Sequence, residues 1–158
     1  MKRVVLALGS NMLDREKNLL GCVKLLHQQV GIVSRLSQVY ETDSWGFTAD
    51  PFLNQVVELQ TSLTPQDLLT ATQAIEKTMG RTEKTRRDCN GKPVYQNRII
   101  DIDILLYGNQ QIVTDELVVP HPLLSQRAFV LEPLVELFGN QIVAPFNVSF
   151  QQMLEHVQ

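Results

Sequence analysis

The segment of residues 98–107, RIIDIDILLY, constrains the fold more than any other part of the sequence. Isoleucine and leucine dominate it and the turn signal Gly108-Asn109 follows, a pattern that predicts a β-strand. Successive side chains of a strand point to opposite faces, so Asp101 and Asp103 share one face. The other face carries Ile100, Ile102 and Ile104. We therefore expect a strand that packs one face on a core and places two neighbouring carboxylates on the other.

Two adjacent carboxylates do not stay ionised in an apolar setting without a counter-charge. A divalent cation supplies that charge, and carboxylate pairs hold Mg²⁺ where phosphate oxygens and waters complete the coordination. The alternative is a solvated strand face, which short Asp-x-Asp patterns more often mark. The metal site is favoured here because the strand is otherwise apolar, because Arg98 precedes the pair and because a basic segment leads into it.

That basic segment, from Arg81 to Arg98, holds six basic and two acidic residues. Its local charge is +4, whereas the rest of the chain has eight basic and fifteen acidic residues, a charge of −7. A basic island on an acidic chain predicts an anionic ligand bound locally. It argues against a protein that coats nucleic acid, which is usually basic throughout. The alternative is an ordinary solvated loop.

The 158 residues predict a single domain, 1–158, large enough to bury a core. We expect a cytoplasmic protein without a signal peptide, because Met1 to Arg3 lead directly into a predicted strand and no apolar run has membrane-spanning length. Cys22 and Cys89 lack the spaced partners of a zinc site, so both are expected to be reduced thiols.

Four strands and two helices are predicted before residue 108, in the order β-α-β-β-α-β. The strands are expected at 3–9, 32–41, 52–60 and 98–107, and the helices at 14–29 and 65–79. This order is typical of the α+β class with a ferredoxin-like antiparallel sheet and helices on its faces. The first strand should be central because it is nearly all apolar, and the aspartate strand should also lie deep in the sheet.

The second helix has the clearest end signals: Thr64 as a cap, Pro65 at the first helical position, Asp67 three residues after the cap, and Gly80 at the end. The remaining residues form a C-terminal extension. It is expected to contain a short strand at 109–113, a brief helix from Ser125, a helix at 129–138 kinked or broken at Glu132-Pro133, and a helix at 147–157 capped by Ser149 or Asn147.

Two long loops, 42–51 and 82–97, flank the predicted site and are plausible lids. Trp45 and Phe47 in the first loop either close on a ligand or fasten the loop to the core. In the second loop, Asn90-Gly91 predicts a hairpin-type turn.

Several polar residues can converge on the aspartate pair. The amide of Asn54 can pair with a donor–acceptor edge of a ligand, or it can make an ordinary cross-strand hydrogen bond. A metal with several cations suits a nucleotide polyphosphate, whose transfer depends on positioning and charge neutralisation. His121 taken alone is more often a structural or surface histidine. The other candidates are Glu76, which shares a predicted helix face with Gln73, and Arg98 and Arg127.

The ordered set of motifs resembles the 6-hydroxymethyl-7,8-dihydropterin pyrophosphokinases of folate biosynthesis over nearly the whole chain. The motifs are Leu8-Gly9-Ser10-Asn11, Tyr40-Glu41-Thr42, Phe52-Leu53-Asn54, Thr72-Gln73 with Glu76, Gly80-Arg81, Arg98 to Ile104, Val119-Pro120-His121 and Arg127-Ala128-Phe129.

The resemblance implies transfer of pyrophosphate from ATP to the hydroxymethyl group of the pterin, with release of AMP. Asp101 and Asp103 would bind two Mg²⁺ ions and act in catalysis with Arg98, and no residue is nominated as a dedicated general base. Asn54 would hydrogen-bond the pterin and the rings of Phe52 and Phe129 would enclose it, with further contacts from Thr42, Asp43, Trp45 and Tyr95. The residues expected to hold ATP are Gln73, Glu76, Lys84, Arg87, Arg98, Ile104, His121 and Arg127. The implied partners are small-molecule substrates, without nucleic acid or membrane, and the implied state is a monomer.

Some positions depart from the family pattern. Gln96-Asn97 replaces a common Gly-Pro, Asp43 replaces a frequent proline, and the basic loop is lengthened by residues 89–92. The basic residue of this loop that contacts ATP therefore remains open among Lys84, Arg86, Arg87 and Lys92. Two other functions are compatible with parts of the pattern: a ferredoxin-like binding module without catalysis, and a metal-dependent nuclease. The intact site residues argue against the first, and the acidic remainder argues against the second.

Overall fold

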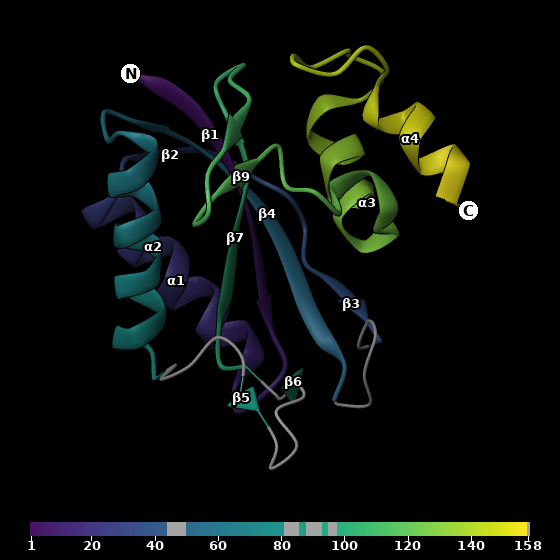
Figure 1. Ribbon diagram of the computed structural model, residues 1–158. Helices are drawn as coiled ribbons and strands as arrows, with labels where there is room; N and C mark the ends of the chain where they lie inside the picture. Colours follow the sequence, from purple (N-terminus) through teal and green to yellow (C-terminus); the bar gives the residue numbers. More distant parts are fainter. Residues whose placement is uncertain (44–49, 81–85, 88–92, 95–97, 158) are drawn as a thin grey trace.

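The computed structural model describes residues 1–43, 50–80, 86–87, 93–94 and 98–157. It is an α+β structure in which helices cover both faces of an antiparallel sheet (Figure 1). The elements in chain order are β1 (Lys2–Ser10), α1 (Arg15–Gln29), β2 (Ile32–Leu36), β3 (Tyr40–Thr42), β4 (Phe52–Thr61), α2 (Pro65–Thr78), β5 (Arg86–Arg87), β6 (Pro93–Val94), β7 (Asp101–Tyr107), β8 (Ile112–Val113), β9 (Val118–Val119), the 3-10 helix η1 (Leu124–Gln126), α3 (Ala128–Phe138) and α4 (Phe150–Val157).

The strands of the main sheet follow the order β2-β4-β1-β7, and β3 pairs with the other end of β4. The prediction of a central first strand is confirmed, because β1 lies between β4 and β7. The prediction that the aspartate strand lies deep in the sheet is wrong, since β7 ends this order. Ile102 and Leu105 of β7 are nevertheless buried, because segments packed on both faces of the sheet cover them.

The single strand predicted at 32–41 is divided into β2 and β3. Ser37 lies between them, and its backbone N–H donates to the Val56 carbonyl at 2.9 Å. Its hydroxyl accepts from the Val56 N–H, also at 2.9 Å. A side-chain oxygen thus takes the place of a backbone acceptor and interrupts the ladder, a competition typical of serine.

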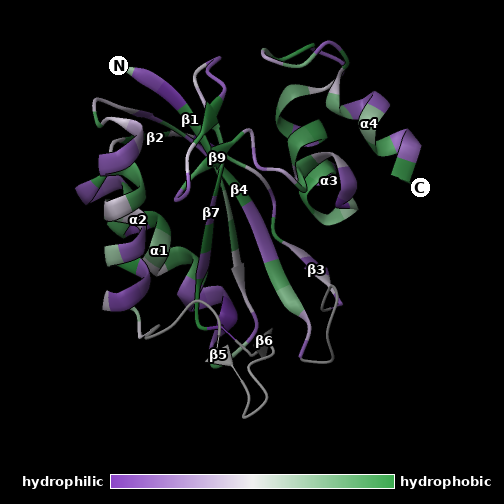
Figure 2. Cartoon of the chain, in the orientation of Figure 1, coloured by the Kyte–Doolittle hydropathy of each residue, from purple (hydrophilic) through white to green (hydrophobic). Residues whose placement is uncertain are grey.

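Two cores lie on opposite faces of the sheet. Helices α1 and α2 cover the first and α3 and α4 the second, and hydrophobic residues follow the central strands between them (Figures 1 and 2). Ile100, Ile102 and Ile104 pack in the first core, as their alternation predicts. Leu105 and Leu106 both pack in the second, because a register shift between β1 and β7 places an extra residue in β7.

The helix ends follow their sequence signals. The Thr64 hydroxyl accepts from the Asp67 N–H at 3.1 Å, and Gly80 beyond α2 has a φ of +109°, as the capping pattern predicts. Ser149 caps α4 by accepting from the Gln152 N–H at 3.1 Å. We predicted a kink or a break at Glu132-Pro133, and the helix does not break there: α3 continues through the buried Pro133.

Cys22 is a free thiol in the first core, as expected, and burial raises its pKa to about 12, with the charge of Glu76 adding to the shift. Cys89 lies outside the described residues. No helix in the described part of the chain is long and apolar enough to cross a membrane.

Candidate active site

Gly9 on β1 is the centre of a row of residues that crosses three strands. Its partner on β4 is Asn54 and its partner on β7 is Asp101. Residues directly opposite in antiparallel strands point to the same face, so Asn54 and Asp101 flank the glycine on one face. In the next row on that face, Ala7 lies opposite Asp103. The small residues of β1 therefore leave space between the amide and the two carboxylates.

The ring of Phe52 and the amide of Asn54 border this space. A Cβ atom built on Gly9 would lie 3.3 Å from Phe52 Cδ1 and 3.5 Å from Asn54 Oδ1. The first distance is tighter than ordinary van der Waals contact, so any side chain at position 9 would displace the ring. Glycine thus keeps a flat apolar surface and a hydrogen-bonding amide close together over the sheet.

The predicted pair Thr42 and Asn54 is brought together across β3 and β4. Asn54 Nδ2 donates to Thr42 Oγ1 at 2.6 Å and approaches the Tyr40 carbonyl at 3.4 Å. This is the cross-strand hydrogen bond that the sequence left as the alternative for Asn54. It also fixes the orientation of the amide, because Nδ2 points to β3 and Oδ1 points to Gly9.

The carboxylate side of the space is bordered by the segment after β9. His121 Nε2 lies 3.9 Å from Asp103 Oδ1, and His121 Nδ1 accepts from the Leu123 N–H at 3.2 Å. Because Nδ1 acts as an acceptor, this geometry assigns the proton of a neutral imidazole to Nε2, on the side of Asp103. Burial lowers the pKa of Arg127, and the charges of Asp103 and Asp101 oppose that shift, which places the guanidinium in the field of both aspartates.

Glu76 lies behind the aspartates. Its side chain is only 4% exposed, and Oε2 accepts from the Ile102 N–H at 2.9 Å. Ile102 is the residue between the two aspartates, so Glu76 fixes the strand that carries them. Gln73, three residues earlier, is exposed instead. Their spacing predicted one shared helix face, but Glu76 is buried against the aspartate strand and Gln73 is exposed.

Residues after β1 hold the ends of both predicted lid loops. Arg15 forms an ion pair with Glu41 at 2.7 Å and donates to the Pro51 carbonyl at 3.0 Å. Asn11 Nδ2 donates to the Asp50 carbonyl at 3.0 Å. In the sequence, Asn11 is recognisable only as part of a motif, because the contacts that give it a role come from residues about 40 and 90 positions away.

Arg98 follows the second loop and is 9% exposed. Its backbone N–H donates to Asn11 Oδ1 at 2.6 Å, and its carbonyl accepts from the Asn11 N–H at 3.0 Å. The same asparagine therefore fixes Asp50 at the end of one loop and Arg98 at the end of the other. This contact holds the entry to the aspartate strand in a defined position.

Phe129 lies at the start of α3, half-buried against the second core, with the Arg127 guanidinium 5.6 Å from the centre of its ring. Ile104 is buried in the first core, so its side chain points to the face away from the aspartates. Asp43 is exposed at the end of β3. Trp45, Lys84 and Tyr95 lie outside the described residues, and Arg87 is described only as part of β5.

The described residues contain no group of three or more histidine, cysteine or acidic side chains that could enclose a metal. The aspartate pair is partly exposed and can offer oxygen ligands on one side only. This donor set fits Mg²⁺, which keeps waters and takes phosphate oxygens as further ligands. Carboxylates, an arginine and a histidine near an amide and an aromatic ring suit a transferase of phosphate-containing groups.

Comparisons with known proteins identify the family. The sequence model described as 7,8-dihydro-6-hydroxymethylpterin-pyrophosphokinase (HPPK) matches residues 5–139. The 2-amino-4-hydroxy-6-hydroxymethyldihydropteridine pyrophosphokinase of Porphyromonas gingivalis is 48% identical over 136 residues, which cover 85% of this chain and 89% of that protein. The enzyme of the same name from Bacillus subtilis is 45% identical over 134 residues, or 84% of this chain and 75% of that protein.

The fold matches solved structures as well. The crystal structure of Plasmodium falciparum HPPK-DHPS wild type has a TM-score of 0.72 and 15% sequence identity, with 98% of this chain covered. The match spans 44% of that longer chain, and at 15% identity it shows the fold alone.

The chain therefore belongs to the 7,8-dihydro-6-hydroxymethylpterin-pyrophosphokinase family. It is a pyrophosphokinase of folate biosynthesis, which transfers pyrophosphate from ATP to 6-hydroxymethyl-7,8-dihydropterin.

Proposed function

We propose that the sheet face around Gly9 is where this transfer takes place, with the pterin over Asn54 and Phe52 and the ATP phosphates over Asp101 and Asp103. The row Asn54-Gly9-Asp101 carries the proposal, because it sets a hydrogen-bonding amide and a metal-binding carboxylate on either side of a residue without a side chain. The hydroxyl of a pterin held by the Asn54 amide would then lie next to the phosphate held at the Asp101 carboxylate.

The pterin side of the site would work by stacking and hydrogen bonding. Phe52 and Phe129 would face the two sides of the ring, as flat aromatic surfaces favour. Asn54, already oriented by Thr42, would contact the polar edge of the ring through Oδ1. Asp43, Trp45 and Tyr95 remain proposed pterin contacts.

The phosphate side would work by positioning and charge. Asp101 and Asp103 would hold two Mg²⁺ ions, which supply charge neutralisation and a template for in-line transfer. Arg127 lies in the electrostatic field of both carboxylates, and the Nε2–H of His121 points toward Asp103, so both are suited to contact phosphate oxygens. Glu76 would act by holding the strand between the aspartates. The other proposed ATP contacts are Gln73, Lys84, Arg87, Arg98 and Ile104.

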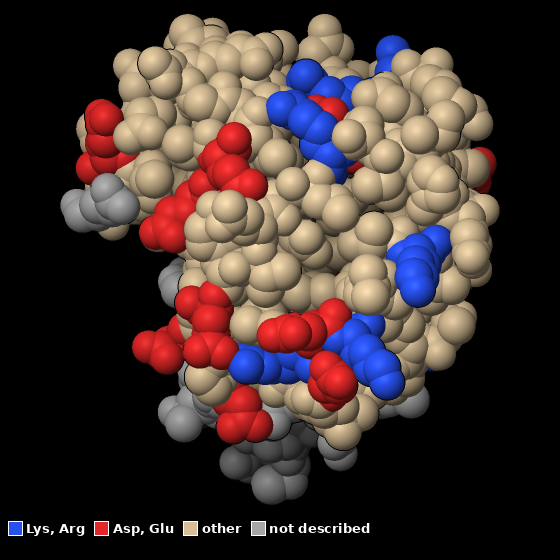
Figure 3. Space-filling model, turned by 180° about the vertical axis from the view of Figure 1, so that it is seen from behind, with Lys and Arg blue, Asp and Glu red and all other residues tan. Residues whose placement is uncertain are grey.

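The strand order and the connections support a ferredoxin-like classification with a C-terminal extension, in a single domain. A cytoplasmic monomer that acts on small molecules remains the proposed state. The nuclease alternative receives no support from the face shown in Figure 3, where acidic and basic residues of the described part are interspersed and form no continuous basic track.

AMP formation tests the transfer reaction that this proposal places on the sheet face around Gly9. The protein is incubated with ATP, Mg²⁺ and 6-hydroxymethyl-7,8-dihydropterin, and AMP is quantified against controls without pterin and with excess EDTA. We expect AMP and the pterin diphosphate to form in equal amounts, and only when ATP, Mg²⁺ and the pterin are all present. AMP at the level of the no-pterin control would overturn the proposal.

A further inference from the structure

The carboxylate of Glu136, on the last turn of α3, binds the segment that joins β2 to β3. Tyr40 donates its hydroxyl proton to Glu136 Oε1 at 2.6 Å. The backbone N–H of Gln38 donates to both oxygens of the same carboxylate, at 2.9 and 3.1 Å. One side chain thus anchors two residues that lie almost a hundred positions earlier in the chain.

Tyr40 also lies against the pterin side of the site. It pairs with Asn54 across β3 and β4, and its carbonyl is 3.4 Å from Asn54 Nδ2. Thr42, two residues later on β3, accepts the shorter hydrogen bond from the same amide. Tyr40 therefore contacts the ligand-facing amide through its backbone and contacts α3 through its side chain.

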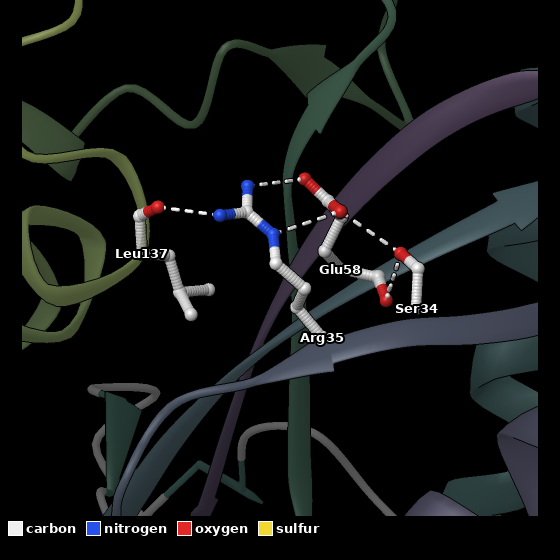
Figure 4. A network of polar contacts seen from close by, with 4 residues as sticks. All are labelled: Ser34, Arg35, Glu58 and Leu137. Atoms are coloured by element: carbon white, nitrogen blue, oxygen red, sulfur yellow. Dashed lines mark hydrogen bonds and ion pairs between the residues drawn. The ribbon is translucent and has the colours of Figure 1, made fainter.

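A second attachment holds the same end of α3 to β2. Arg35 Nη1 donates to the Leu137 carbonyl at 2.5 Å, while Nε and Nη2 contact the two oxygens of Glu58 at 3.1 and 2.8 Å (Figure 4). The guanidinium also lies 4.8 Å from the centre of the Phe138 ring. The C-terminal end of α3 is thus fixed to β2 by Arg35 and to the β3 segment by Glu136.

The opposite end of α3 carries Phe129 and follows Arg127, so the helix connects the fixed end to the site. A rigid helix that is held at one end transmits any shift of that end to the other. The position of Phe129 relative to Asn54 then depends on the contact between α3 and β3.

We propose that Tyr40 and Glu136 form a positioning pair that sets the spacing between Phe129 and Asn54, and so determines how tightly the enzyme holds the pterin. This inference rests on the proposed location of the pterin. Neither residue contacts the substrate in this account; both act through the elements that do.

The chemistry of the pair suits this role. A short hydrogen bond to a carboxylate is stronger and more directional than a neutral one. The bond to Glu136 is the largest cause that raises the pKa of Tyr40 to about 12, so the phenol remains a donor at neutral and alkaline pH. The pair lies at the surface, where such contacts add little to global stability. Loss of the hydrogen bond between Tyr40 and Glu136 should therefore change the local geometry more than the global stability.

The test measures equilibrium binding of the pterin and of ATP, together with the thermal midpoint, for Tyr40→Phe, Glu136→Ala and the double variant. We expect Tyr40→Phe to raise the pterin dissociation constant about fivefold, from the loss of one net hydrogen bond. Glu136→Ala also removes the acceptor of the Gln38 N–H, so it should raise this constant at least as much. ATP binding and the thermal midpoint should stay close to those of the unsubstituted protein. Because the two side chains act as one contact, the double variant should be no weaker than Glu136→Ala.

Two further variants separate geometry from charge. Glu136→Gln keeps a carbonyl oxygen that can accept from Tyr40, and should bind pterin within twofold of the unsubstituted protein. Glu132, one turn earlier on α3, affects Tyr40 through its charge, so Glu132→Gln removes a nearby charge and should leave binding unchanged.

The inference is overturned if the unsubstituted protein binds pterin but Tyr40→Phe and Glu136→Ala do so equally well. Equal weakening of pterin and ATP, or a thermal midpoint that falls in proportion to the binding loss, would also overturn it. An unsubstituted protein that binds ATP but neither binds nor turns over the pterin would instead count against the proposed function.

Discussion

Asn54 and Asp101 lie on different strands, yet both are paired with Gly9 and both flank it on the same face of the sheet. The amide is expected to hold the acceptor substrate and the carboxylate to hold the metal. In the proposed placement, the two substrates would meet over one residue that has no side chain.

Gly9→Val should impair pterin binding first. Its Cβ would meet the Phe52 ring at 3.3 Å, and its methyl groups would enter the space over Asn54. We expect a loss of at least about 1.4 kcal/mol in pterin binding, or about tenfold in the dissociation constant. Isothermal titration calorimetry with each substrate measures the two dissociation constants. The dissociation constant of ATP should change less than that of the pterin. Pterin affinity within twofold of the unsubstituted value would show that the space is not occupied by the ring.

Gly31→Ala should destabilise the fold without a specific effect on substrates. A Cβ on Gly31 would lie 2.1 Å from the Gln60 carbonyl oxygen, a backbone atom that cannot easily move. The expected loss is about 2–3 kcal/mol in the free energy of unfolding, measured by denaturant titration. Gly21→Ala on α1 is the matched control, because its nearest neighbour would be Met79 Cε at 3.9 Å. That control should be as stable or slightly more stable, and equal losses in both would refute the steric argument.

Glu76 should be replaceable by glutamine but not by alanine. Glutamine retains an oxygen that can accept from the Ile102 N–H, whereas alanine leaves that buried donor unsatisfied, at a cost of about 1–3 kcal/mol. Thermal unfolding of the two variants provides the comparison, with turnover as a second readout. If Glu76→Gln and Glu76→Ala lost stability equally, the hydrogen bond to the aspartate strand would not be what Glu76 contributes.

Glu58 should make stability depend on acid pH. The hydrogen bond from Arg35 is the main cause that lowers the pKa of Glu58 in the folded protein. As the pH falls, the unfolded chain binds this proton first, so the stabilisation is present above the unfolded pKa of about 4.3 and is lost as the pH falls through the folded pKa. Denaturant titrations from pH 6 downward should show a smaller acid loss for Glu58→Gln than for the unsubstituted protein. Glu155→Gln, on the exposed side of α4, is the control and should keep the full slope.

The sequence predicted the parts of the fold that depend on local pattern. Alternation placed Ile102 and Ile104 in a core and the aspartates on the other face, and the Thr64 cap marked the start of α2. The division at Ser37 was missed because it depends on a hydrogen bond to Val56, and a serine within a strand has no local sign of that partner. The edge position of β7 was missed because an edge strand whose faces are covered by packed segments has the same apolar sequence as a strand with neighbours on both sides.

For the site, the sequence predicted which residues take part through their motifs, but not the contacts between residues distant in the chain. Among the motif residues, Asn54 contacts Thr42, and His121 lies near Asp103. The orientation of Glu76 toward Ile102 and the contact of Glu136 with Tyr40 were not foreseen, because each joins residues that are distant in the chain. The acidic residue at position 136 lies on an exposed helix face, where sequence patterns indicate only solvation.

The claim that the aspartate pair holds the metals for pyrophosphate transfer is tested most directly by the turnover of Asp103→Ala. AMP formation is measured at saturating ATP, Mg²⁺ and pterin, with Glu155→Ala as a control and circular dichroism to confirm folding. The account predicts that Asp103→Ala nearly abolishes AMP formation while its spectrum and the activity of the control remain unchanged. A folded Asp103→Ala protein with activity within about tenfold of the unsubstituted enzyme, a difference of only about 1.4 kcal/mol in the barrier, would contradict it.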